Sequence, residues 1–263
     1  MIRDITIGQY YPVDSSVHRL DPRTKILLTF TYIIALFLVD SIWGYIGVVL
    51  ALGGAITMSK VPLKYMLRGL KSIVFILLFT VILNIFFTPG EHVIIKWAFI
   101  YITWEGILFA IEMGTRLILL IVGSSLLTLT TSPIQLTDGI ESLLMPFTKI
   151  HVPAHEIAMM MSISLRFIPI LLEETDKIMK AQTARGADFE TGNIMQRAKA
   201  MIPIMVPLFI SAFRRAEDLA MAMEARCYQG GKGRTRMNTL KYTSKDYIAF
   251  GFGVVYVVLC IIL

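Results

Sequence analysis

Two short stretches, Ala181-Gln182-Thr183-Ala184-Arg185-Gly186 and Ala222-Met223-Glu224-Ala225-Arg226-Cys227, decide how the whole chain is interpreted. Each closes a long amphipathic segment and ends in a small residue, an arginine and another small residue. Arginine is always charged and offers five donors in a planar fork, which suits a helix end that docks on a partner. The helix dipole alone also favours an arginine in a last turn, so that simpler interpretation stays open for either one. Because the pattern occurs twice, we predict two docking tips, residues 184–186 and 225–227.

The segments that lead to the tips are predicted to be long amphipathic helices. Apolar residues recur there at helical spacing, and several are methionines, whose flexible side chains suit surfaces that repack. The alternative is that these apolar residues form an ordinary core between helices of this chain. Pro203 and Pro207 should bend the second helix, and it stays open whether residues 200–213 enter the bilayer. The candidate contact residues for a membrane partner are Met160, Met161, Phe209, Phe213 and Met223.

The composition indicates an integral membrane protein. Hydrophobic residues make up 56% of the 263-residue chain, against about 45–50% in soluble domains, and the mean hydropathy is +0.68. The formal charge of +6 is better explained by membrane topology than by nucleic-acid binding. Cys227 and Cys260 are the only cysteines, which excludes a disulfide framework or a zinc cluster. The polar residues 1–21 do not form a cleavable signal.

Apolar runs predict an all-α membrane protein with about five spans. Asp21 is predicted to be the N-cap of the first helix, and Pro22 its first residue. Residues 59–71 are predicted to lie as a short helix in the membrane interface, and residues 91–103 to form a short loop or an interfacial helix. The predicted spans are residues 25–39, 42–58, 72–87, 104–129 and 246–263.

The distribution of lysine and arginine predicts the orientation. Basic residues are concentrated before the first span, in 59–71 and in the glycine-rich linker 228–245, so these segments should be cytoplasmic and residue 263 outside. The predicted domains are residues 1–131, with four spans; 132–245, a cytoplasmic coupling domain; and 246–263, a last span.

Charged residues inside a predicted span are candidates for function. Glu112 and Arg116 are four positions apart on one helix face and are expected to pair, or to extend toward the membrane surface.

The sequence motifs for nucleotide binding and for two classes of protease are each incomplete. Gly231-Lys232 is followed by Gly233, so the nucleotide-binding P-loop is absent, and His155-Glu156 is followed by Met159 where a zinc-protease motif needs histidine. His151 and His155 alone are too few for a metal site. Glu173-Glu174 resembles the motif of membrane CAAX proteases, but Ile178 stands at the arginine position. We therefore predict no enzyme activity, no metal and no cofactor in this chain.

The tips, the lead-in residues 7–12 (IGQYYP) and 18–25 (HRLDPRTK), and residues 164–169 (SLRFIP) together resemble one family over the whole chain. It is the transmembrane T component, EcfT, of energy-coupling factor (ECF) transporters. The lead-in is most similar to the shared subgroup that serves several substrates. The second tip departs from the family pattern, because Cys227 stands in the place of glycine.

The resemblance implies a coupling scaffold of an ABC importer in a bacterial cell membrane. The tips would dock on two ABC-type ATPase subunits, EcfA and EcfA′, which bind ATP and Mg²⁺, and the apolar helix faces would bind a substrate-binding S component. Specificity for a vitamin or micronutrient would then reside in that other chain. A self-contained secondary transporter is the alternative, and an intramembrane enzyme is the less favoured one. The residues expected to shape the fold are Asp21, Pro22, Arg23, Arg166 and Pro169.

Overall fold

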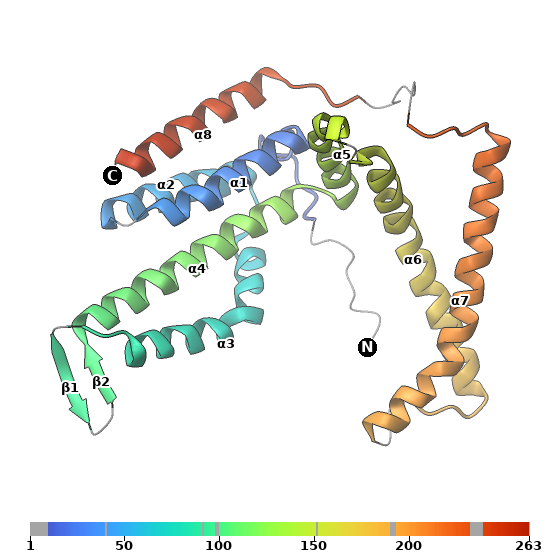
Figure 1. The fold of residues 1–263 in the computed structure, drawn as a ribbon, viewed down its shortest axis with the longest axis horizontal. Coiled ribbons are helices and arrows are strands. Elements are labelled where there is room, and N and C mark those ends of the chain that lie inside the picture. Colours follow the sequence, from blue (N-terminus) through green and yellow to red (C-terminus); the bar gives the residue numbers. More distant parts are fainter. Residues whose placement is uncertain are drawn as a thin grey trace. The chain divides into compact units, whose positions relative to one another are not determined.

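The computed structural model describes residues 10–39, 41–90, 92–97, 100–150, 152–189, 193–231 and 239–262. Most of these residues are helical, which confirms the predicted all-α class (Figure 1). Residues 7–9 of the lead-in, His151, residues 232–238 of the basic linker and residue 263 lie outside the described ranges. The elements in order are α1 (Pro22–Leu38), α2 (Ile42–Ser59), α3 (Leu63–Phe87), β1 (Val93–Trp97), β2 (Ile100–Thr103), α4 (Trp104–Thr130), α5 (Pro133–Leu144), the 3-10 helix η2 (Met145–Ile150), α6 (Ala154–Ala184), α7 (Ile194–Ala225) and α8 (Ser244–Ile262).

Several of these helices can cross a membrane. Among the described residues, α2, α4, α6 and α8 are long and apolar enough, and α3 is a fifth if its two bent parts form one span. The chain is therefore a multi-pass membrane protein. The set differs from the prediction in two helices. α6 qualifies, although it was assigned to the coupling domain, and α1, with 17 residues, is not among the qualifying helices.

The segment from residue 63 to residue 103 refines one prediction and corrects another. The parts of α3 before and after residue 72 are bent by 63°, at the predicted boundary between an interfacial helix and a span (Figure 1). The expectation of a loop or helix over 91–103 is wrong, because β1 and β2 form an antiparallel hairpin before α4. Isoleucine, valine, tyrosine and tryptophan dominate this stretch, and such residues favour strands.

The chain divides into two compact units. We call residues 140–238 the tip unit and residues 8–139 with 239–263 the span unit. The chain passes from one unit to the other inside α5, after Gly139.

The core of the span unit forms where α1 runs antiparallel to α4. The Lys25 ammonium donates a hydrogen bond to the carbonyl of Thr130 (2.9 Å), and the Tyr32 hydroxyl donates to the carbonyl of Leu119 (2.9 Å). The Tyr32 ring lies so close to Gly123 that a Cβ there would be 2.3 Å from it, so only glycine allows this approach. Around these contacts lies an apolar cluster that includes Leu36, Val39, Val48, Leu52, Met66 and Leu129.

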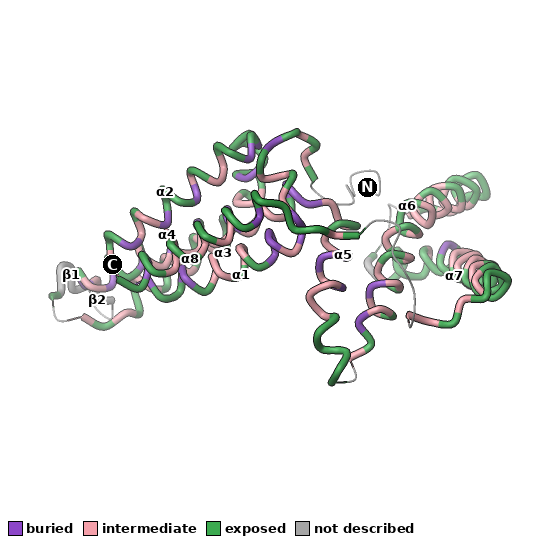
Figure 2. Tube along the Cα trace, turned by 90° about the horizontal axis from the view of Figure 1, so that it is seen from above, coloured by how far each residue is buried: buried purple, intermediate pink, exposed green. Residues whose placement is uncertain are grey.

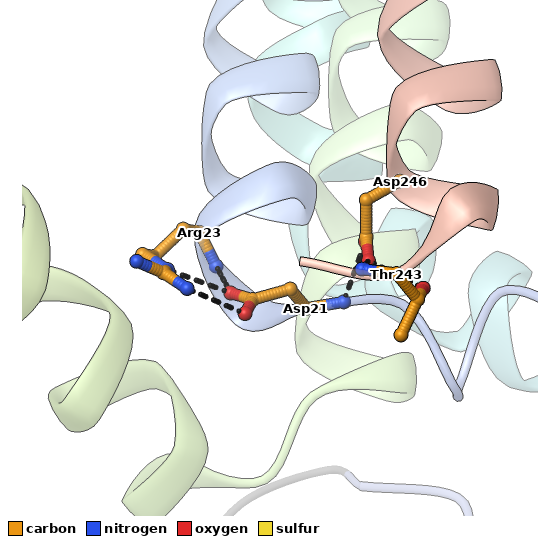
Figure 3. Close-up of polar contacts among 4 residues, drawn as sticks. All are labelled: Asp21, Arg23, Thr243 and Asp246. Carbon is orange, nitrogen blue, oxygen red and sulfur yellow. Dashed lines mark hydrogen bonds and ion pairs between the residues drawn. The ribbon is translucent and has the colours of Figure 1, made fainter. Parts of the chain in front are cut away.

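The start of α1 is joined to the start of α8 by polar contacts (Figure 3). The Asp21 carboxylate accepts a hydrogen bond from the Arg23 N–H (2.9 Å) and caps α1, with Pro22 in the first turn, as predicted. The Asp21 N–H in turn donates to Asp246 Oδ1 (2.8 Å). Asp246 Oδ2 accepts from the N–H (2.7 Å) and hydroxyl (2.6 Å) of Thr243. The Arg23 guanidinium also lies 4.0 Å from the centre of the Tyr242 ring.

Candidate functional site

The first predicted docking tip is a helix end of defined geometry. α6 ends at Ala184, Arg185 is its C-cap, and Gly186 follows with φ of +90°. The Gly186 N–H donates to the carbonyl of Thr183 (2.9 Å), and the Ala187 N–H donates to that of Gln182 (3.0 Å). These two bonds and the left-handed glycine form a Schellman motif, which satisfies the last carbonyls of the helix.

The second tip repeats this geometry at the end of α7. Arg226 is the C-cap and Cys227 follows with φ of +55°. The Cys227 N–H donates to the carbonyl of Glu224 (2.8 Å), and the Tyr228 N–H donates to that of Met223 (3.0 Å). Cys227 therefore takes the left-handed conformation that glycine adopts readily and other residues adopt at a cost. The substitution of cysteine for glycine leaves the motif intact.

Both arginines are accessible to a partner. Arg185 and Arg226 are exposed, as are the small residues on either side of each. Within the ranges that the structure describes, neither guanidinium forms a hydrogen bond or an ion pair with another side chain. Nothing lies within 4 Å of the position that a Cβ of Gly186 would take. Each tip therefore offers a positive charge with five donors on an open surface.

α6 and α7 pack against each other in antiparallel directions, which separates the tips. The Gln182 side chain lies 3.5 Å from the carbonyl of Pro203, and the Arg215 guanidinium lies 3.5 Å from the Glu174 carboxylate. The first tip thus lies near Pro203, and the second lies 22 residues further along α7, about 33 Å at 1.5 Å per residue. The crossing of the two helices is visible in Figure 1. The Glu174–Arg215 pair was not predicted from the sequence, because it joins two helices.

Most of the surface of α6 and α7 remains accessible. The described buried residues on the two helices are few: Ala154 and Ala158 on α6 and Ile204 on α7 (Figure 2). Of the five predicted contact residues, Met160, Phe209 and Phe213 are more than half exposed, whereas Met161 and Met223 are partly covered. The rings of Phe209 and Phe213 stack with their centroids 6.5 Å apart. The tip unit by itself therefore leaves Met160, Phe209 and Phe213 largely uncovered.

Arg166 and Pro169 lie on α6 and behave differently from each other. Pro169 stands inside the helix, as expected. Arg166 was expected to set helix packing; its side chain is exposed, and its role in packing stays a prediction.

Glu112 and Arg116 of α4 form the predicted ion pair, with 2.9 Å between Oε1 and the guanidinium. The pair also joins two other helices. The guanidinium donates to the Tyr45 hydroxyl (2.9 Å) and to the carbonyl of Val39 at the end of α1 (2.8 Å). This places the charges in a structural network that ties α1, α2 and α4 together.

His155 contacts two polar side chains from other segments. Its ring lies between Glu141 and Tyr228, at 3.1 Å and 3.3 Å. No group of three or more potential ligands, among histidine, cysteine, aspartate and glutamate, could hold a metal ion in the described part of the chain. The sequence analysis missed this contact, whose members lie on three separate segments.

The apolar helices and the two exposed helix ends define a multi-pass helical membrane protein. Comparison with known proteins agrees. The model of the CbiQ family, described as "Cobalt transport protein", matches residues 14–237. The chain belongs to this family, as the EcfT transmembrane component of an energy-coupling factor transporter.

Curated relatives cover nearly the whole chain. An energy-coupling factor transporter transmembrane protein EcfT of Clostridium kluyveri is 60% identical over 95% of this chain and 93% of its own length. The protein of the same name from Ruminiclostridium cellulolyticum is 57% identical, over 97% and 96%. That of Bacillus subtilis is 49% identical, over 94% and 93%.

Proposed function

We propose that this chain couples ATP-driven motion of two ABC-type ATPase subunits to a substrate-binding S component. The ATPase subunits, EcfA and EcfA′ in the family, would each receive one docking tip. Closing and opening of the ATPase pair would displace Arg185 and Arg226, and the crossed helices would pass the displacement to the membrane. This chain would act as a scaffold without catalysing a reaction.

The observation that carries the proposal is the repeated geometry of the tips. Two helix ends with the same Schellman motif each present an exposed arginine without a partner of its own in the described chain. They lie far apart on one crossed helix pair. A helix cap needs the backbone bonds but does not need an exposed arginine at the same place twice. Two receptors of similar shape, as in a pair of related ATPase subunits, explain both features.

The exposed apolar face of α6 and α7 is the surface that we assign to the S component. Met160, Phe209 and Phe213 would be covered by apolar helices of that chain, and the flexible methionine would allow more than one S component to bind. Specificity for a vitamin or micronutrient would reside in the S component, which fits a shared T component that serves several substrates.

Nucleotide chemistry would reside in the partner subunits, with ATP and Mg²⁺ bound there. The sequence carries no P-loop, so the purified chain should neither bind nor hydrolyse ATP. The tip unit should face the cytoplasm, where ATP is available, which agrees with the lysine and arginine distribution. Saturable ATP binding by the chain alone in equilibrium dialysis would contradict this assignment.

Co-purification from the native membrane tests the proposal. An affinity-tagged chain extracted in mild detergent should bring two ATPase subunits and at least one further membrane protein with it. The matched control is the same chain with both Arg185→Glu and Arg226→Glu, which should retain the membrane partner and lose the ATPase subunits. A wild-type chain that transports substrate when purified alone would instead support a secondary transporter.

A further inference from the structure

The chain that follows the second tip is tied to the beginning of α6 and to α5 by three polar side chains. Tyr228 comes directly after the tip, His155 lies in the first turn of α6, and Glu141 lies in the last turns of α5. The Tyr228 hydroxyl oxygen is 3.3 Å from His155 Nε2, and His155 Nδ1 is 3.1 Å from Glu141 Oε1. We call these three residues the tip anchor.

The chemistry of the three groups gives each hydrogen bond a direction. An ionised carboxylate only accepts hydrogen bonds, so His155 Nδ1 carries the proton and donates to Glu141. In the neutral ring Nε2 then accepts, and the Tyr228 hydroxyl donates to it. Glu141 is only 8% exposed, and a buried carboxylate is costly without such partners. The ring of His155 is therefore held from both sides.

The contact of Gly231 with the His155 ring also holds the chain after the second tip against the start of α6. Gly231 lies against His155 so closely that a Cβ would be 2.6 Å from ring carbon Cδ2. Both Tyr228 and Gly231 thus bring the chain after the tip against the start of α6. Tyr228 also supplies the backbone N–H that closes the Schellman motif of the second tip, so one residue links the motif to the anchor.

The first tip lacks an equivalent side chain. Ala187 occupies the position in its motif that Tyr228 occupies in the second, and alanine has no polar group to anchor. The two tips therefore share a backbone geometry and differ in the side chain at this position. This asymmetry depends on the side chains and is independent of the substitution of cysteine for glycine.

We propose that His155 is a positioning residue that fixes the direction of the second docking tip. Held by the anchor, Arg226 presents its guanidinium to an ATPase subunit in a preset direction, and less ordering is needed on docking. Arg185 docks without this help. The inference rests on the proposed function, since it requires that the tips bind ATPase subunits.

The test measures the affinity of the ATPase pair that co-purifies with the wild-type chain. The pair is removed and titrated back onto the full chain in lipid nanodiscs. Tyr228→Phe removes only the hydroxyl, and His155→Leu removes both hydrogen bonds. Tyr228→Phe should weaken binding about fivefold to tenfold, as expected for the loss of one positioned hydrogen bond, and His155→Leu should weaken it at least as much. Tyr247→Phe, at an exposed tyrosine of α8, is the matched control and should bind as the wild type does.

A double-mutant cycle separates positioning from general damage. Because the anchor acts through the second tip, Tyr228→Phe should cause no further loss in an Arg226→Ala chain and its full loss in an Arg185→Ala chain. Equal further losses in both chains, or wild-type affinity for Tyr228→Phe and His155→Leu, would overturn the positioning role while leaving the proposed function intact. Failure of the wild-type chain to bind any ATPase pair would overturn both.

Discussion

Gly186 and Cys227 occupy the same position in two copies of one helix-ending motif. Each follows a C-cap arginine, each has a positive φ, +90° and +55°, and each donates its N–H to the carbonyl three residues earlier. Glycine has no Cβ to hinder this conformation, whereas cysteine has one. The geometry of the docking tips is therefore kept by different residues at different conformational cost.

Exchanging these two residues should change stability in opposite directions. Gly186→Ala should destabilise the chain by about 1 kcal/mol, and Cys227→Gly should stabilise it by about 0.5–1 kcal/mol, because only glycine adopts positive φ without strain. The thermal unfolding midpoint in detergent measures both. Gly251→Ala is the control, because open space surrounds that helical glycine too and its φ is ordinary. An equal loss in Gly251→Ala would show that the left-handed conformation is not the cause.

Charge reversal at the tips should uncouple transport without unfolding the span unit. As a helix-end charge alone, each arginine is worth about 0.3–1 kcal/mol, whereas a charge-assisted contact to a partner is worth about 1.5–3 kcal/mol. A loss of about 3 kcal/mol weakens docking about a hundredfold. Arg185→Glu and Arg226→Glu should each reduce substrate uptake by the reconstituted complex, and the double variant should abolish it. If the double variant retains wild-type uptake, the arginines are helix caps only.

Replacing Asp246 should loosen α8 from α1. The residue is fully buried and accepts hydrogen bonds from Asp21 and Thr243. Asp246→Ala leaves the buried Asp21 N–H and the partly buried donors of Thr243 without an acceptor, which should cost about 3 kcal/mol. The unfolding midpoint should fall well below that of Lys245→Ala, a substitution of the exposed neighbouring residue. A change no larger than that of Lys245→Ala would show that the contact contributes little.

The ion pair in α4 should matter for folding more than for transport. Arg116→Ala leaves the Glu112 carboxylate and the Val39 carbonyl without the guanidinium, and losing such charge-assisted hydrogen bonds in a partly buried pair should cost about 1.5–3 kcal/mol. The double variant Glu112→Gln/Arg116→Gln should recover part of that loss, because no uncompensated charge remains. Uptake per folded complex should stay near the wild-type value in the double variant. Normal folding with abolished uptake would instead place the pair in the transport mechanism.

His18 should make stability depend on pH. Burial lowers the pKa of its imidazole from the usual 6.5, although a hydrogen bond to the Tyr11 carbonyl opposes the shift. As pH falls through 6.5 the unfolded chain takes up the proton first, so stability is complete above 6.5 and decreases below it. The unfolding midpoint of His18→Gln should therefore fall less between pH 7 and pH 5 than that of the wild type. Parallel curves would contradict this.

The sequence by itself determined the class of the protein and the position of the two helix ends that we propose as docking tips. The mean hydropathy and the lengths of the apolar runs identify a helical membrane protein. A membrane span must form its backbone hydrogen bonds within itself and present apolar side chains to the lipid. The start of α1 followed from Asp21 and Pro22, and the tips followed from a repeated local pattern. Even the Glu112–Arg116 pair could be predicted, since residues four apart share a helix face. All of these features depend on residues that lie close together in the sequence.

Only the tertiary structure decided which distant residues meet. Asp21 and Asp246 are 225 positions apart, and His155 and Tyr228 are 73 apart; no helical period relates them. The positive φ of Cys227 was also unforeseen, because cysteine does not favour it and the carbonyls at the end of α7 supply the compensation. Helical periodicity shows which face of a helix is apolar, but the packing of that face against other helices depends on the shapes of all of them together.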